Sequence, residues 1–572
     1  MTGRQQLTSN FPRFAVAGAL ALGLFEPPIS RSFAQQAGPD PADPADIRRR
    51  IEERESPVRP QVPEVDIVPQ AVPALPAEDG LPSFVLSAVL IEGATVFDPV
   101  AFGPLYEDYL ARPVTSDDVE AILSRITDMY RDNGYFLSRA IATPQDVESG
   151  LLRVTIVEGF IEMVELAGDV PDPELIRPYT DRIREQRPLT LALFERTLLL
   201  INDLNGISIG VNLAPAADNA GAYDLTLKVN YDAVDGNTYF DNRGTRSVGR
   251  LQTWLSGGMN SVLGFGERLQ LGLFTVPNQP KELIYLDVRY EQPIGLNGTY
   301  VSLTGSRTDS EAGGKLKAVN AESESYSGEV SVRHPVIRTR RQNLWLIGSL
   351  EFLKSGEERL GATRFEDRTR VARLRTTYSL SDDLDGVTRF NVEASKGLDI
   401  FGASKQGAAN LSRFNGRSDF TKVRAEISRA QGLADDFALV ISVKGQKSSV
   451  PLLSSEEFGV GGSRYGRGYD SSEITGDDGA AGSAELRYDQ QIDEAYLQAF
   501  QIYGFYDIGA VWNTLPGGSS VRASLASIGG GIRLTVTPSV FATIEVAKPL
   551  TRVVANEGDE DPRAFFSFAA RF

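Results

Sequence analysis

The chain contains the stretch Phe458-Gly-Val-Gly-Gly-Ser-Arg-Tyr-Gly-Arg467-Gly-Tyr-Asp470, in the longest gap between its strand-like segments, roughly residues 448–481. Five glycines, two arginines and two tyrosines predict neither a helix nor a strand of a sheet ladder here. Glycine reaches backbone conformations closed to other residues, which suits a folded loop tip. Long loops without secondary structure are uncommon and are mostly functional or disordered. The stretch is therefore the first candidate for a functional element.

The segments that follow this loop decide how it could be held. Residues 482–488 and 505–509 both have the pattern of strands. A guanidinium of the loop and a carboxylate one hairpin away could form a forked, charge-assisted pair. The sequence therefore predicts that such a pair holds the loop in one position.

Strand-like segments fill the chain from about residue 235 to its end. Leu269, Leu271 and Leu273 alternate with Gln270 and Gly272, and the same period of two runs through the other segments. Sixteen segments are expected, starting near residues 235, 250, 267, 283, 298, 324, 343, 366, 387, 420, 437, 482, 499, 523, 540 and 563. Short and long connections alternate, as in a membrane β-barrel, and a closed barrel leaves no unpaired edge in lipid. A soluble sandwich is the alternative with the same period.

Length, charge and composition exclude several classes of function. A chain of 572 residues is too long for one ordinary domain. Without cysteine, disulfides, thiolate metal sites and cysteine nucleophiles are excluded, and a single histidine excludes any site that needs two imidazoles. The net charge of -18 argues against a nucleic-acid partner, because neutralising phosphates takes an excess of Lys and Arg.

The first 34 residues have the pattern of a secretory signal. Arg4 and Arg13 precede the apolar run 14–25, and Ser32-Phe-Ala34 has the small residues of a cleavage site. The apolar run is too short to span a bilayer, which takes about 20 residues. No later segment reaches that length, so a role in a membrane would have to use strands.

Residues 35–82 predict a helix followed by a tether. The segment 43–55 is helix-like, with proline near its start and only Ile47 and Ile51 as an apolar seam. Residues 57–82 are proline-rich, which predicts an extended spacer. We interpret residues 35–56 as a detachable helix, with a disordered processing remnant as the alternative.

Two copies of one β-α-α-β-β pattern lie between the tether and the strand-only region, and such internal repeats define the organisation of a chain. In residues 83–158, strands are expected at 84–91, 135–141 and 151–157, and helices at 97–110 and after the capping-box pair Thr115 and Asp118. In residues 159–232, strands are expected at 161–166, 207–212 and 223–230, and helices at 171–184 and 190–204.

These features together resemble the two-partner-secretion transporters of Gram-negative outer membranes (the TpsB group, hemolysin activation/secretion proteins). The order of signal, helix, tether, two repeats and barrel is similar over nearly the whole chain. Local motifs agree with it. They are Tyr130-Arg-Asp-Asn-Gly-Tyr135, Asp241-Asn-Arg-Gly244 at the end of the first barrel strand, Gly466-Arg467-Gly468-Tyr469, with Gly466 in place of the usual valine, and Phe505-Tyr-Asp507-Ile-Gly509.

The resemblance implies a transmembrane antiparallel barrel of about sixteen strands at 233–572, two periplasmic POTRA domains and a plug helix. It implies export of one large unfolded partner, a TpsA-like exoprotein bound extended by the POTRA domains. The expected setting is the outer membrane and its lipid, with the protein as a monomer, not an enzyme, and without cofactor or metal. An assembly factor for other barrels is the alternative function, and a passive pore is a third class.

The resemblance also assigns the candidate site residues. The loop latch consists of Arg467, Gly468, Tyr469 and Asp507, supported by Phe505 and Gly509 on a neighbouring strand. Glu485 and Arg487 are expected to belong to the general charge network of the lumen. The plug helix residues are Ile47, Arg48, Ile51 and Glu52. An exposed loop cation at Arg467 and an unrelated lumen charge at Asp507 are the alternatives.

Overall fold

The computed structural model describes Ala45, Ile47, Arg49, Arg50 and residues 65–67, 83–143, 145–147, 149–216, 219–494 and 496–572. The predicted signal segment lies outside the described residues, as do Arg48, Ile51 and Glu52. In the part of the chain that is described, no helix is long and apolar enough to cross a membrane.

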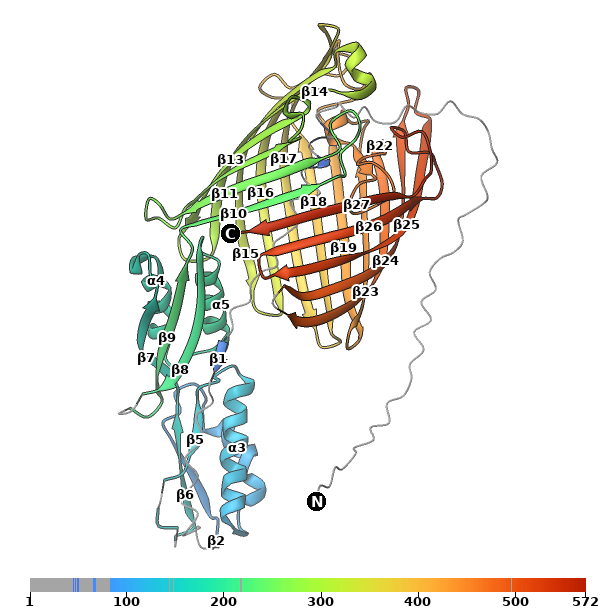
Figure 1. Ribbon diagram of the computed structural model, residues 1–572. Helices are drawn as coiled ribbons and strands as arrows, with labels where there is room; N and C mark the ends of the chain where they lie inside the picture. The colour runs from blue at the N-terminus through green and yellow to red at the C-terminus, as the bar shows by residue number, and fades with distance from the viewer. Residues whose placement is uncertain are drawn as a thin grey trace. The chain divides into compact units, whose positions relative to one another are not determined.

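Sixteen antiparallel strands form a closed barrel in which each strand pairs with the barrel strands before and after it along the chain and β10 closes onto β27 (Figure 1). The strands are β10 Val234–Asp241, β11 Gln252–Asn260, β12 Arg268–Thr275, β13 Ile284–Ile294, β14 Thr299–Glu311, β15 Glu322–Arg338, β16 Gln342–Arg359, β17 Ala362–Asp382, β18 Gly386–Gly397, β19 Thr421–Ala434, β20 Phe437–Ser448, β23 Asp478–Glu494, β24 Leu497–Thr514, β25 Ser520–Thr537, β26 Val540–Pro549 and β27 Arg563–Arg571. Each begins within about four residues of its expected start.

The two faces of the barrel wall have opposite chemistry. Leu271 on β12 is 55% exposed and Leu303 on β14 is 51% exposed, whereas Glu485 on β23 and Asp507 on β24 are buried inside. A soluble sandwich would place these two kinds of residue the other way round, since burial of apolar surface drives its folding. The sandwich alternative is therefore wrong, and the period of two marks a wall with an apolar outer face.

The first repeat contains β2 Phe84–Val85, β3 Ala88–Glu92, β4 Pro113–Val114, α3 Ser116–Asp132, β5 Arg139–Ile141 and β6 Leu151–Val157. Thr115 and Asp118 form the predicted capping box at the start of α3. The helix expected at 97–110 is instead three short turns, η1 Pro99–Phe102, α2 Gly103–Tyr106 and η2 Glu107–Tyr109. Pro99, Gly103 and Pro104 explain the correction, because neither residue type sustains a helix interior.

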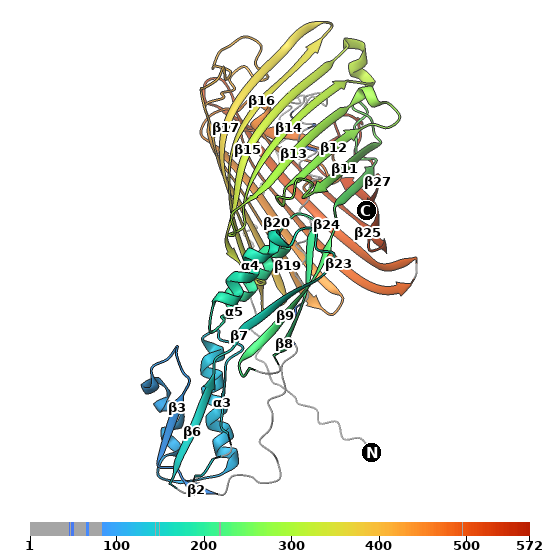
Figure 2. The ribbon, with the colours of Figure 1, turned by 90° about the vertical axis from the view of Figure 1, so that its left-hand side faces the viewer.

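The second repeat contains β7 Phe160–Gly168, α4 Pro173–Glu185, α5 Leu191–Asn202, β8 Ile207–Pro215 and β9 Ala222–Tyr231, with both helices on one face of the sheet (Figure 2). A further strand, β1 Val65–Ile67, pairs in parallel with β8, so the sheet order is β1-β8-β9-β7. The tether predicted as a plain extended spacer therefore contributes a strand to this sheet, because the edge of β8 offers unpaired main-chain groups.

Side chains of the second repeat also contact the barrel. The carboxylate of Asp203, just after α5, accepts hydrogen bonds from Nε and Nη2 of Arg338 at 2.8 and 2.6 Å. The Tyr300 hydroxyl donates to the main-chain oxygen of Asp203 at 2.7 Å. Nη2 of Arg196 donates to the carbonyl of Pro335 at 3.0 Å. The end of α5 is thus held against the strand ends of β14 and β15.

Candidate functional site

The long connection between β20 and β23 is a folded hairpin rather than an open loop. Within it, β21 Phe458–Val460 pairs antiparallel with β22 Ile474–Gly476, which corrects the expectation that the glycine-rich stretch contains no ladder strand. Its buried apolar side chains pack against Ala481, Val511 and Leu525 of the barrel wall; they are Phe458, Val460, Tyr465, Tyr469 and Ile474. The loop therefore has an apolar face of its own that fits the inner wall.

Arg467 and Asp507 form the predicted forked pair. Nε and Nη2 of Arg467 donate to Oδ2 and Oδ1 of Asp507 at 3.0 and 2.9 Å. The main-chain N–H groups of Gly466 and Arg467 donate to the same Oδ2 at 3.2 and 3.0 Å. Arg467 is 5% exposed and Asp507 is 0% exposed. One carboxylate on β24 thus fixes both the side chain and the backbone of the loop tip, which excludes the two alternatives of a free cation and an unrelated charge.

Glu485 belongs to this contact more directly than expected. Its Oε2 accepts a short hydrogen bond from Nη1 of Arg467, so the assignment to the general charge network is wrong for this residue. Arg487 contacts Glu485 at 2.7 Å, and Arg533 contacts it at 2.9 Å. Arg487 therefore reaches the loop through Glu485, and the structure shows no direct contact between Arg487 and Arg467.

Phe505 and Ser483 complete the surroundings of the guanidinium. The Arg467 guanidinium carbon lies 3.4 Å from the centroid of the Phe505 ring, in cation–π geometry. Nη2 of Arg467 also donates to Oγ of Ser483 at 3.0 Å, and that hydroxyl donates to Asp507 at 2.7 Å. We use the name loop latch from here on for Arg467 with Asp507, Glu485, Ser483 and Phe505.

Glycines let the loop lie close to the wall. A Cβ on Gly468 would lie 2.8 Å from the nitrogen of Pro549 and 2.9 Å from the main-chain carbon of Lys548, so only glycine fits there. A Cβ on Gly509 would lie 2.5 Å from a methyl carbon of Val460 on β21. Gly466 has φ +96°, a backbone conformation in which a β-branched residue is strained. The glycine that replaces the usual valine therefore matches the local backbone.

Tyr469 and Asp470 extend the contact to the connection between β26 and β27. The Tyr469 hydroxyl accepts from the main-chain N–H groups of Thr551 and Arg552, both at 3.3 Å. Asp470 accepts from Nη2 of Arg563 at 2.7 Å. The tip of the loop is thus held on two sides, by β23 and β24 and by the last two strands.

The described residues of the plug helix lie inside the barrel. Ala45, Ile47, Arg49 and Arg50 are helical, and Ile47 is fully buried among Val248, Phe274, Val276 and Leu283. These four partners are barrel-wall and connecting residues, so Ile47 makes an apolar contact that the sequence did not predict. The predicted contributions of Arg48, Ile51 and Glu52 lie outside the described residues.

Arg49 is a functional candidate that the sequence did not single out. Its Nε donates to Oγ of Ser472 at 2.7 Å, and its Nη1 donates to the carbonyl of Ser454 at 2.9 Å. Ser454 and Ser472 lie on the two arms of the long loop, before β21 and before β22. The sequence shows a run of three arginines at 48–50. Which arginine contacts the loop depends on the rotation of the helix about its own axis inside the barrel.

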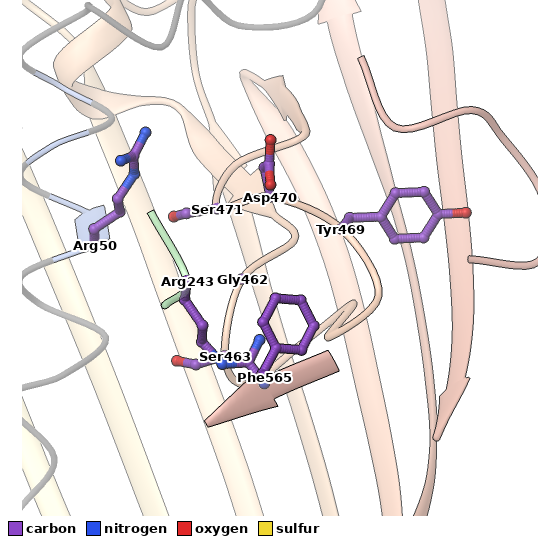
Figure 3. A pocket seen from close by; sticks show the side chains of 8 residues that line it. All are labelled: Arg50, Arg243, Gly462, Ser463, Tyr469, Asp470, Ser471 and Phe565. Carbon is purple, nitrogen blue, oxygen red and sulfur yellow. The ribbon is translucent and has the colours of Figure 1, made fainter. Parts of the chain in front are cut away.

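A small cavity lies where the helix, the loop and the barrel wall meet (Figure 3). It has a volume of about 20 Å³, room for about one water molecule. Its lining comes from the plug helix, the segment after β10, the loop and β27, and consists of Arg50, Arg243, Gly462, Ser463, Tyr469, Asp470, Ser471 and Phe565. In Figure 3, Arg50 of the helix stands across the cavity from the loop residues.

The chemistry available at this site is binding and release. Among the described residues, no group of three acidic, histidine or cysteine side chains could hold a metal ion. The arrangement consists of ion pairs, hydrogen bonds and packed rings that hold a loop and a helix within a barrel lumen. Such an arrangement can obstruct the lumen or clear it.

Comparisons with known proteins identify the family. Residues 224–534, more than half of the chain, match the model described as haemolysin secretion/activation protein ShlB/FhaC/HecB, and residues 84–159 match the ShlB-type POTRA domain. The heme/hemopexin transporter protein HuxB of Haemophilus influenzae is 24% identical, over 95% of this chain and 97% of that protein.

Two solved structures have the same fold. CdiB from Escherichia coli superposes with a TM-score of 0.70 at 20% identity, covering 94% of this chain and 100% of that chain. BamA from Haemophilus ducreyi, without its POTRA domains 1–3, has a TM-score of 0.51 at 13% identity, covering 86% of this chain and 100% of that chain. With the match of the family model, the chain belongs to the ShlB/FhaC/HecB-type haemolysin secretion/activation proteins, transporters of the outer membrane with POTRA domains and a β-barrel.

Proposed function

We propose that this protein exports one large partner protein, delivered unfolded from the periplasm, through its barrel to the cell surface. One observation carries the proposal: the lumen of a closed barrel holds a helix and a long loop, both attached by polar contacts that can be broken and re-formed. An obstruction that can be removed implies a barrel that opens. The family and the transporters named HuxB and CdiB support the same reading.

Capture of the partner takes place on the POTRA sheets. An extended chain can add to an exposed sheet edge through main-chain hydrogen bonds, which tolerate many sequences. The second POTRA sheet already accepts one such segment, because β1 pairs in parallel with β8. Among the described residues, β7 forms the other edge of this sheet, and β3 and β5 form the edges of the first POTRA sheet. A partner segment bound in the same way is handed onward toward the lumen.

Passage through the lumen requires the plug helix to leave. The partner's arrival displaces the helix, which breaks the two hydrogen bonds of Arg49 and removes Ile47 from its apolar site. The loop latch then keeps the long loop in a fixed position while the partner passes. No nucleotide is needed for these steps, because each exchanges one set of non-covalent contacts for another.

Assembly of other barrels into the outer membrane is the second candidate, and the BamA-like fold favours it. At 13% identity this likeness extends to the fold alone, whereas the family model describes secretion. The two functions differ in what is lost when the protein is removed. An exporter affects one secreted partner, and an assembly factor affects many outer-membrane proteins.

The test deletes this protein and measures both quantities in the same cells. We expect one large secreted protein to disappear from the cell surface, while the amounts of other barrels stay unchanged. Re-expression of the intact chain restores the surface signal. Normal surface display of the partner, together with a general fall in other barrels, would favour the assembly function instead.

The plug is tested separately by conductance in a planar bilayer. Deletion of residues 43–55 should raise the single-channel conductance, and Arg49→Ala should raise it less, because Ile47 still packs in its site. Arg177→Ala, which alters an exposed pair with Glu174 on α4, is the matched control and should leave the conductance unchanged. Equal conductance of the deleted and intact proteins would contradict the role of the helix as a plug.

A further inference from the structure

Glu456 is a buried carboxylate of the long loop that the loop latch does not use. It lies in η5 Ser454–Glu456, at the start of the loop, and is 1% exposed. Nη2 and Nη1 of Arg373 donate to its two carboxylate oxygens at 2.7 and 3.2 Å. Nζ of Lys422 lies 2.5 Å from Oε2, and Lys422 is itself 2% exposed. A carboxylate buried to this extent is stable only with such partners.

The main chain around Glu456 is held as firmly as its side chain. The carbonyl of Glu456 accepts hydrogen bonds from Nζ of Lys422 and from Nε2 of Gln446, both at 3.0 Å. Nε2 of Gln446 also donates to the carbonyl of Asp477 at 3.1 Å, at the other end of the loop. One amide on β20 therefore ties the outgoing and the returning arm together.

These contacts lie on a part of the wall that the loop latch does not touch. Arg373, Lys422 and Gln446 belong to β17, β19 and β20, and Arg373 is itself paired with Glu351 on β16 at 2.8 Å. The loop latch joins Arg467 of the loop to residues on β23 and β24. The two sets share no residue, so Glu456 and the loop latch attach the loop to different parts of the wall.

The plug helix contacts the loop beside Glu456. Arg49 donates to the carbonyl of Ser454, two residues before Glu456, and to the hydroxyl of Ser472 on the returning arm. The positions of both acceptors depend on how the two arms are held. Fixing the base of the loop thus also fixes the binding site of Arg49.

We propose that Glu456, with Arg373, Lys422 and Gln446, is a second anchor of the long loop, independent of the loop latch, and that it positions the loop for the plug helix. We call this set the basal anchor. Glu456 is a positioning residue, since it acts through the loop. Its loss loosens the base of the loop while the tip remains bound by Arg467, and loss of Arg467 loosens the tip while the base remains bound.

The experiment follows loop movement at two reporter cysteines. The natural chain contains no cysteine, so an introduced one gives an unambiguous signal. Ser455, beside Glu456, and Ser471, close to the tip, have hydroxyls that are buried and make no hydrogen bond with any described residue. Ser455→Cys and Ser471→Cys are therefore mild changes, and the rate at which a maleimide labels each one in intact cells reports the opening of the loop at that place.

Glu456→Gln should raise the labelling rate of Ser455→Cys by about tenfold and leave that of Ser471→Cys nearly unchanged. Arg467→Ala should do the opposite. Lys422→Met removes the same ion pair from the wall side and should change the two labelling rates in the same way as Glu456→Gln. The proposal can therefore be tested even if one of the two variants fails to insert. Glu456→Asp, which keeps the charge, should restore slow labelling. Glu366→Gln, at an exposed ion pair on β17, is the matched control.

The outcome that overturns the proposal is an unchanged rate for Ser455→Cys in both Glu456→Gln and Lys422→Met, with the barrel intact by its mobility on heated and unheated gels. Faster labelling at both reporters with Glu456→Gln would also overturn it, because the two anchors would then not be independent. Loss of partner export in Glu456→Gln is a further readout that rests on the proposed function. Failure of the intact protein to export any partner would count against that function and leave the labelling result standing.

Discussion

Two arginines of this protein hold carboxylates in the same forked geometry, one inside the barrel and one where the second POTRA domain meets it. Arg467 contacts Asp507 at 2.9 Å, with side chains 6% and 0% exposed, and Arg338 contacts Asp203 at 2.6 Å, with side chains 6% and 17% exposed. The difference lies in their surroundings. Arg467 neutralises Glu485 as well, and Asp507 also binds the loop backbone, whereas Arg338 has one carboxylate and the amide of Asn343.

The consequence of removing an ion pair depends on which other groups its two members hold. Removing Arg467 leaves the buried carboxylate of Asp507 without its arginine, takes one of three arginines from Glu485, and frees the backbone of the loop tip. Removing Arg338 leaves one carboxylate, which is partly exposed and still lies next to other contacts between α5 and the barrel. We therefore expect unequal consequences from two contacts that are alike in their distances and in their donor atoms, Nε and Nη2.

The largest effect is expected for Arg467→Ala. An uncompensated buried charge costs about 3–5 kcal/mol, so the tip should detach from β23 and β24. Export of the partner should fall by at least about tenfold, while the barrel still inserts. Surface display of the partner measures export, and the mobility of the protein on heated and unheated gels measures insertion of the barrel. Arg464→Ala, three residues away at a more exposed pair with Glu426, is the control and should export normally. Normal export by Arg467→Ala would refute the role of the latch.

A smaller effect is expected for Gly468→Ala, which keeps every charge of the latch. The added methyl would lie within 3.0 Å of Ser527, Lys548 and Pro549, so the tip must move away from the wall. Overpacking of this kind costs about 1–3 kcal/mol. Export should fall severalfold but not vanish. Gly328→Ala on β15, where nothing lies within 4 Å of the added carbon, controls for the substitution itself. If both alanine variants export alike, close approach of the loop is not required.

The same two ion pairs show what the sequence could and could not predict. Arg467 and Asp507 each lie in a motif that resembles one of the two-partner-secretion transporters, so their pairing could be inferred from that resemblance. Asp203 and Arg338 lie in no motif and are 135 residues apart, on elements whose docking depends on the whole fold. Glu456 was visible beside Glu457, but only the structure shows that Arg373 and Lys422 meet it.

The secondary structure also has parts that the sequence could predict and parts that it could not. The barrel strands were predictable because an alternating pattern over eight or more residues is a strong signal. The three residues of β1 are too few to form a pattern, and their strand character comes from the edge of β8. Pro99 and Pro104 indicate a break in the helix expected at 97–110, because proline disrupts a helix interior. The prediction followed the apolar spacing instead.

The junction side of the comparison is tested by Asp203→Asn. The amide keeps the shape but loses the charge, and a hydrogen bond to a charged group contributes about 1.5–3 kcal/mol. Amide hydrogen exchange in the turn after Arg338 should become severalfold faster, with a modest fall in export. Asp181→Asn, at an exposed pair with Arg184 on α4, is the matched control. Unchanged exchange in Asp203→Asn would mean that the remaining contacts hold the junction without the charge.

The smallest effect is expected in the first POTRA domain, where a carboxylate is held by hydrogen bonds rather than by an arginine. Glu158 accepts from the N–H groups of Thr95 and Val96 at 2.8 and 3.2 Å and from the Tyr130 hydroxyl at 2.9 Å. Burial favours a raised pKa, but these hydrogen bonds outweigh it, and the pKa of Glu158 lies below its usual range. Its stabilising contribution is thus present above the unfolded-state pKa of about 4.3 and is lost as pH falls through the lower folded-state pKa.

Protection of the Thr95 and Val96 amides from hydrogen exchange, relative to an unstructured chain at the same pH, should therefore fall between about pH 5 and pH 3 in the intact protein. Glu158→Gln removes the titrating group. In this variant the protection of the Thr95 and Val96 amides should be lower than in the intact protein at about pH 5, and nearly independent of pH. Equal pH dependence in both proteins would show that other carboxylates govern this segment. A carboxylate that is held by uncharged donors should thus lose its hold on the backbone by protonation alone.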